Sequence, residues 1–177
     1  MSNIKLKALT RTAVLLALTL VLQALGRYIT AFIGPNSNFI VGPLVNACLI
    51  IAAASVGLWS GSLIAIMAPF GAVLTGAAIP LPFIPFIAVG NFLLVLFFYI
   101  SKKNYYLGIL IGSVAKSGFL FASVYFFLYM FKAALDIKPG IVKAMYMTFS
   151  WQQLITALLG GAIALAVIKA LGKNIEI

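Results

Sequence analysis

The chain has 177 residues, of which 64% are hydrophobic and 8% charged, and its mean hydropathy is +1.20. A water-soluble domain has about 45–50% apolar and about 25% charged residues, so this composition excludes an ordinary soluble domain and indicates a membrane protein. Twelve lysines and arginines stand against two acids, Asp136 and Glu176. Because this positive charge can lie against anionic lipid headgroups, we expect a lipid bilayer as partner and no nucleic acid.

The residue types that are missing exclude most enzyme chemistry. There is no histidine, there is one cysteine, and both acids lie in the C-terminal quarter. Such a chain lacks the side chains for a histidine-based triad, a catalytic carboxylate pair or a Cys/His zinc site. We therefore expect no enzyme, no metal site and no cofactor. The string GSVAKS at 112–117 lacks the glycines of a phosphate-binding loop, so any ATP-driven work requires a separate nucleotide-binding subunit.

Six continuous apolar stretches follow one another along the chain. Each is about long enough to cross the ~30 Å hydrocarbon core as a helix. They cover residues 8–33, 40–58, 61–79, 85–100, 106–131 and 148–171. The sequence thus predicts an all-α integral membrane protein with six transmembrane helices in a single membrane domain over residues 1–177. Residues 132–147 are predicted to be the one sizeable connection.

The distribution of basic residues predicts the orientation in the membrane. Lysine and arginine accumulate in cytoplasmic loops. Seven basic residues fall on the side of the termini and four on the other side, the former being Lys5, Lys7, Arg11, Lys102, Lys103, Lys169 and Lys173, the latter Arg27, Lys132, Lys138 and Lys143. We therefore expect both termini in the cytoplasm and the protein in the cell membrane as a multi-pass protein.

Lys116 is the most informative single residue. It is the eleventh residue of the fifth predicted span, about 16 Å along that helix and too deep for its ammonium group to reach water easily. A charge at that depth costs at least about 2.5–3.5 kcal/mol, and no predicted span contains an acid to neutralise it. Its partner is then a carbonyl oxygen, a water molecule or a ligand. The two interpretations left open are a ligand site and a lysine held by carbonyls at a helix end.

Further polar side chains lie in the predicted outer half of the spans and could line one pocket together with Lys116. They are Asn46, Asn91, Ser123, Trp151, Gln152 and Gln153, with Asn36 and Asn38 in the first outer loop. Hydrogen bonds between helices are the alternative role for Asn46 and Asn91. Anchoring at the membrane interface is the alternative for Trp151, and turn formation for the two loop asparagines.

Small residues recur at four-residue spacing, which gives a helix a smooth face for close approach. The pairs are Ala13 with Ala17 and Gly108 with Gly112, followed by the series Ala162, Ala166 and Ala170. Packing within the chain explains such faces as readily as docking to a partner does.

These features together resemble the substrate-binding S component of an energy-coupling factor (ECF) transporter. The resemblance covers the whole chain and includes the AxxxA pattern of Ala13 and Ala17 and the stretches GPLVNACLIIAAASVGLWSGSLIAIMAPFGAVLTG and PFIPFIAVGNFLLVLF. It implies a vitamin-uptake subunit that captures its substrate outside the cell. It also implies partners, namely a transmembrane T component, which would meet Ala13 and Ala17, and two ABC-type ATPase subunits.

The resemblance further implies a substrate site in the outer half, lined by spans four to six and covered by the first outer loop. By their depth and polarity, the candidates for this lining are Asn91, Lys116, Ser123, Trp151 and Gln152, with Asn38 near the lid. One cation among amides favours a small heterocycle with a carbonyl, carboxylate or ionisable hydroxyl group. The other function classes are a stand-alone secondary transporter, which usually has intramembrane acids, and a structural or assembly subunit that binds no small molecule.

Overall fold

The structure, a computed structural model, describes residues 3–76, 81–101, 103–131 and 136–172. All regular elements in these ranges are helical, so the all-α prediction is confirmed for them. The α-helices are α1 (Asn3–Ile33), α2 (Asn38–Ser55), α3 (Leu58–Leu74), α4 (Ile84–Ile100), α5 (Tyr105–Phe131), α6 (Pro139–Thr148) and α7 (Trp151–Leu171). Two short 3-10 turns, Gly34–Ser37 and Leu81–Phe83, precede α2 and α4.

Five helical segments are long and apolar enough to cross a membrane. They are Ile4–Ile33, Asn38–Ser55, Leu81–Ile100, Tyr105–Phe131 and Pro139–Leu171. The third predicted span corresponds to α3, which has only 17 residues. Its predicted continuation to Ile79 includes residues 77–79, which lie outside the described residues. The structure thus supports a multi-pass membrane protein, with five segments of spanning length in the described ranges.

The prediction of a long connection over residues 132–147 is wrong for its second half, where α6 lies. Pro139 stands in the first turn of α6, where its fixed φ favours a helix and its missing N–H costs nothing. Val142, Met145 and Tyr146 then follow at helical spacing and pack on α5 and α4. The charged residues around this short apolar stripe made the segment resemble a loop. Residues 132–135 lie outside the described residues.

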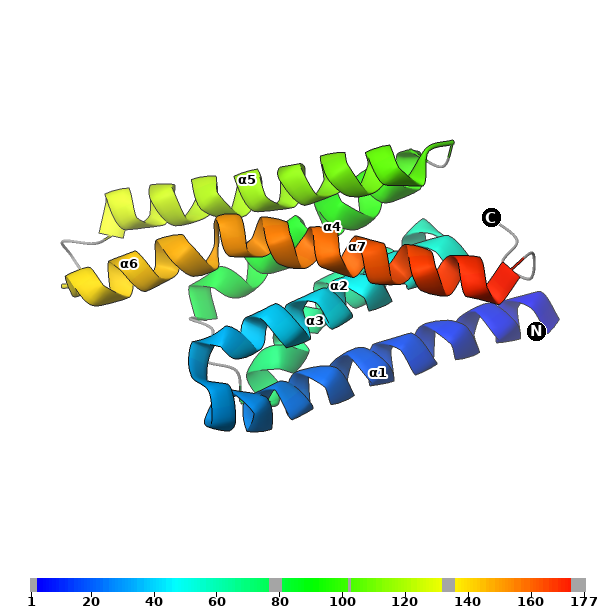
Figure 1. The fold of residues 1–177 in the computed structure, drawn as a ribbon, viewed down its shortest axis with the longest axis horizontal. Coiled ribbons are helices and arrows are strands. Elements are labelled where there is room, and N and C mark those ends of the chain that lie inside the picture. The colour runs from blue at the N-terminus through cyan, green and yellow to red at the C-terminus, as the bar shows by residue number, and fades with distance from the viewer. Residues whose placement is uncertain (1–2, 77–80, 102, 132–135, 173–177) are drawn as a thin grey trace.

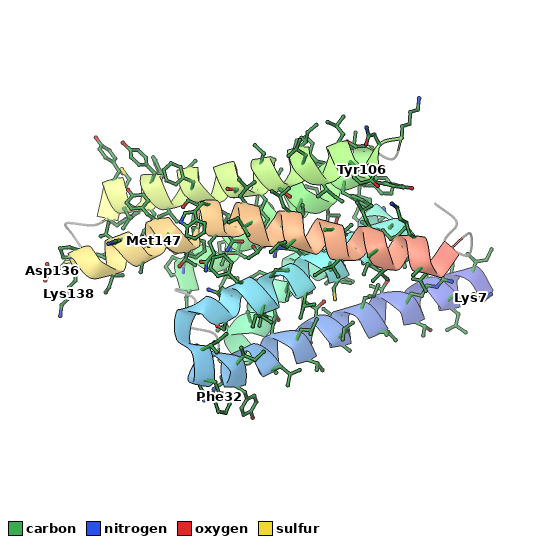
Figure 2. The ribbon with its side chains drawn as sticks, viewed as in Figure 1. Lys7, Phe32, Tyr106, Asp136, Lys138 and Met147 are labelled. Carbon is green, nitrogen blue, oxygen red and sulfur yellow. The ribbon has the colours of Figure 1, made fainter. Side chains whose placement is uncertain are left out.

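The helices form an elongated bundle in which α1 and α5 lie on opposite sides (Figure 1). The start of α1 and the end of α7 lie at the same end, which we call the terminal end, and the α1–α2 turn and α6 lie at the distal end. Lys7 and Tyr106 mark the terminal end in Figure 2, and Asp136 and Lys138 the distal end. Asn3 and Leu171, the outer ends of these two helices, therefore lie at the same end of the bundle.

Glycines bring several helices into close contact. A Cβ atom on Gly112 of α5 would lie 2.9 Å from the Leu94 carbonyl oxygen of α4, and one on Gly160 of α7 would lie 2.6 Å from the Pro43 carbonyl oxygen of α2. Only a residue without a side chain allows such approaches of backbone to backbone. Gly108 also faces the backbone of α4 at Phe98, so the glycine pair of α5 serves packing within the chain.

The buried apolar residues form two clusters, one toward each end of the bundle. The terminal core joins α2, α3, α4, α5 and α7 and includes Ile50, Ile64, Leu94, Phe98 and Ile109. The distal core joins the start of α4, the second half of α5, α6 and the segment before α7, through Phe83, Leu120, Val124, Leu128, Met145 and Phe149. On α5, Ile109 belongs to the terminal core, and Leu120 is the first residue of the distal core. Lys116 lies between these two residues.

Candidate functional site

Lys116 of α5 is bonded to Asn46 of α2 between the two cores. The side chain of Lys116 is 3% exposed and that of Asn46 is 2% exposed. The Nζ atom of Lys116 donates a hydrogen bond of 2.6 Å to Oδ1 of Asn46. Lys116 is therefore buried in the bundle, and its partner is a carbonyl oxygen, one of the candidates expected from sequence, supplied here by the side-chain amide of Asn46.

The positive charge of Lys116 is not balanced by this contact. Asn46 is neutral, and an ammonium group has three N–H donors, of which its Oδ1 accepts one. Within the described ranges, Lys116 forms no further hydrogen bond or ion pair. The chain has two carboxylates, and the one that the structure describes, Asp136, lies at the distal tip of the bundle (Figure 2). The site between the cores thus holds a buried amine whose protonated form has two spare donors.

Ser113 adds a second polar group to the same face of α5. It lies three residues before Lys116, is 0% exposed, and its Oγ has no hydrogen-bond partner among the described residues. Helical side chains lean toward the N-terminal end of their helix, so the lysine stem passes over the turn that contains Ser113. Sequence reasoning missed this serine because one serine in an apolar helix does not reveal whether its own helix satisfies its hydroxyl group.

Asn91 of α4 points toward α3 and bonds a carbonyl group that a proline leaves free. Pro69 lies inside α3 and has no N–H group, so the carbonyl oxygen of Ala65 lacks its usual helical donor. The Nδ2 atom of Asn91 lies 3.4 Å from that oxygen and donates to it. This is the helix-to-helix role that the sequence left open for Asn91, and it places the amide in the contact of α3 with α4.

The other predicted lining residues lie farther toward the distal end and differ in their surroundings. Ser123 is buried, and its hydroxyl group donates to the Phe119 carbonyl oxygen of its own helix at 2.8 Å. Trp151 is half exposed at the start of α7, and its ring lies 5.7 Å from that of Phe39. Gln152 is partly buried beside it, and Asn38 is exposed at the start of α2. Lys116 contacts none of these through a described hydrogen bond.

A cluster of phenylalanine rings fills the space between the distal ends of α4, α5 and α6. The rings of Phe83 and Phe149 stack with 5.3 Å between their centres, and Phe127 meets Phe83 edge-on at 4.9 Å. Phe83 is fully buried. Sequence reasoning treated the proline-rich segment at 79–85 as a turn and did not assign Phe83 to a core. The apolar distal core therefore lies between Lys116 and the distal end of the bundle.

The two small residues of α1 face outward. Ala13 and Ala17 are both exposed, while the opposite face of α1 packs on α2 and α3. Thr12 shares a 2.8 Å hydrogen bond with Ser60 of α3, and Gln23 donates to the Ala68 carbonyl oxygen at 2.9 Å. The AxxxA face is thus left open within the described chain, in contrast to the glycine face of α5.

A helical bundle with several spans and a buried, partly satisfied polar site is typical of a multi-pass membrane transport protein. The chain matches the family model described as the substrate-specific component of ECF transporters over residues 7–172, and it belongs to that family. This is a family of transporter substrate-binding components rather than of enzymes, and its members work with T and ATPase components. No curated protein and no solved structure matches the chain.

Proposed function

We propose that this chain is the high-affinity substrate-binding subunit of an ATP-driven ECF importer for a vitamin or a related small heterocyclic metabolite. It resides in the cell membrane with six spans, both termini in the cytoplasm and the distal end facing outward. The observation that carries this proposal is the buried ammonium group of Lys116, bonded only to the neutral amide of Asn46 among the described residues. A substrate oxygen would supply the missing acceptor.

The energetics favour a ligand over a purely structural lysine. A charge near the centre of a bilayer costs at least about 2.5–3.5 kcal/mol. The single charge-assisted hydrogen bond to Asn46 leaves two N–H donors of the ammonium group unused. If Lys116 served packing alone, methionine could fill the same space without the cost of a buried charge, because its apolar chain is similar to the lysine stem. A charge-assisted hydrogen bond donated by the ammonium group to a substrate carbonyl or anion would satisfy a second donor, and an anion would also balance the charge.

The other proposed lining residues lie along the path from the distal end to Lys116. Trp151, Gln152 and Asn38 lie near the outer entrance of this path, and Ser123 lies two turns beyond Lys116 on the same buried face of α5. Asn91 joins the lining only if its long hydrogen bond to α3 opens. Since the distal core occupies this side, we expect substrate entry to separate Phe83 from Phe149.

The partners of the importer would be a transmembrane T component and two ABC-type ATPase subunits. The open face of α1 at Ala13 and Ala17 is suited to the T component, because small side chains allow close approach of another helix. No residue of this chain is needed for ATP hydrolysis in such an assembly.

The test is to purify the full chain and the Lys116→Met variant and to identify by mass spectrometry the small molecule that co-purifies with each. We expect a heterocyclic metabolite with the wild-type protein and a large loss of it in the variant. Equal retention by both proteins would rule out Lys116 as the binding group. Uptake in liposomes without T component and ATPases would instead indicate a secondary transporter, and the absence of any bound molecule an assembly subunit.

A further inference from the structure

Ser113 carries an unpaired hydroxyl group inside the bundle. Its side chain is 0% exposed, and its Oγ has no partner among the residues that the structure describes. Serines in membrane helices usually bond a carbonyl of the preceding turn, as Ser123 does with Phe119 on the same helix. Buried hydroxyl groups without partners are rare and destabilising, so this one requires an explanation.

The position of Ser113 relative to Lys116 provides that explanation. The two residues are three apart on α5 and are both buried on the face that α4 and α7 cover. Because a helical side chain leans toward the N-terminal end, the stem of Lys116 passes over the turn that contains Ser113. Lys116 offers two further N–H donors there beyond the one used by Asn46, and Ser113 offers its O–H.

Three donors and one uncompensated charge require a particular kind of ligand. A neutral carbonyl would satisfy a donor but leave the buried positive charge unbalanced. A carboxylate carries one negative charge, which balances one ammonium group, and its two oxygens can accept from both side chains at once. An internal water molecule would satisfy Ser113 but not the charge.

We propose that the substrate is a carboxylate and that its two oxygens bind the Lys116 ammonium group and the Ser113 hydroxyl group. This inference rests on the proposed function, since it specifies the group that the importer recognises. In the empty state Asn46 holds the ammonium group in place. On binding, the carboxylate becomes the main partner of Lys116, and Ser113 is the second binding residue.

The inference is tested with pairs of compounds that differ only in the acidic group. The purified full chain is titrated with nicotinate and nicotinamide, pantothenate and pantothenol, biotin and biotinamide, and benzoate and benzamide, at constant ionic strength. The readout is the shift of the thermal unfolding midpoint with concentration, because a ligand that binds only the folded state raises it. We expect saturable stabilisation by at least one acid and none by its neutral partner.

Variants connect the stabilisation to the two residues. For the acid that binds, Ser113→Ala should weaken binding roughly tenfold and Lys116→Met roughly a hundredfold or more. Ser113→Ala should not lower the midpoint of the ligand-free protein, because it removes an unpaired hydroxyl group. The matched control is Ser62→Ala, since Ser62 is also buried with an unpaired Oγ but belongs to α3. We expect unchanged binding in this control.

Three outcomes of the titrations would overturn the inference. They are the absence of stabilisation by every acid of the panel, equal stabilisation by an acid and its neutral partner, and binding of the acid that Ser113→Ala leaves intact. The proposed function is judged separately, by uptake into liposomes with the T component and the ATPases. Uptake of a neutral compound that depends on Lys116 would contradict the carboxylate inference and leave the proposed function standing.

Discussion

Asn91 donates its side-chain amide to the Ala65 carbonyl oxygen at 3.4 Å, at the position in α3 where Pro69 removes the helical donor. A proline in a membrane helix leaves a polar group that lipid cannot satisfy, so a neighbouring side chain that reaches it stabilises the bundle. One contact thus accounts for the presence of both Asn91 and Pro69. A double-mutant cycle tests this coupling.

We expect Asn91→Ala to lower the free energy of unfolding by about 1 kcal/mol in the wild-type background. In the Pro69→Ala background the cost should be smaller, because residue 69 then supplies its own N–H to Ala65. Thermal unfolding of the four purified proteins in one detergent gives the coupling energy. Additive effects of the two substitutions would contradict the proline-based role of Asn91.

Changing Asn46 tests the charge balance of the central site. Asn46→Asp places a carboxylate beside Lys116, where Oδ1 now lies at 2.6 Å, and we expect a gain of about 1 kcal/mol in stability. The same substitution should abolish binding of any acid from the titration panel, because the site is then already neutral. Asn46→Leu leaves Lys116 without its acceptor and should cost about 1–3 kcal/mol. A destabilised Asn46→Asp protein that still binds an acid would contradict the proposed role of Lys116.

The close contact of α4 with α5 depends on Gly112. A Cβ atom there would lie 2.9 Å from the Leu94 carbonyl oxygen, so Gly112→Ala should push the helices apart and destabilise the protein by about 1–3 kcal/mol. Gly118 of the same helix has nothing within 4 Å of such an atom. Gly118→Ala is therefore the control, with unchanged or slightly raised stability because alanine favours a helix. Equal unfolding midpoints for the two variants would show that the contact is not tight.

The open face of α1 predicts that transport and binding can be separated. Ala13→Trp and Ala17→Trp add large side chains at exposed positions, so we expect normal folding and normal substrate binding. Transport with the T component and ATPases in liposomes should be lost, because a close helix contact no longer forms. Leu18→Trp, at an exposed position outside the AxxxA pair, is the control. Full uptake by the alanine variants would remove the docking role of this face.

The helices were predictable because each span is a long apolar run, and the predicted ends of α1, α4 and α5 fall within a few residues of the observed ones. The helix α6 was not predictable, because ten residues with a narrow apolar stripe resemble a loop when charges flank them. The burial of Lys116 followed from its depth along α5 alone.

The partners of the site residues were harder to predict, because they depend on helix rotation. Asn46 and Asn91 had the same two candidate roles in the sequence, and the structure turns Asn46 to Lys116 and Asn91 to α3. Which way each amide faces is decided by the glycine contacts between helices, such as that of Gly160 with α2. A single sequence contains no measure of those contacts.

Because the buried apolar residues form two separate cores, the distal core can open while the terminal core stays packed. The backbone departs from helical geometry at Ser150, between α6 and α7, so we expect α6 to open locally more readily than α7. Amide protons near Met145 should therefore exchange with solvent faster than those near Leu94 or Ile50. In the proposed importer, such local opening would admit a molecule at the distal end without moving the exposed face of α1.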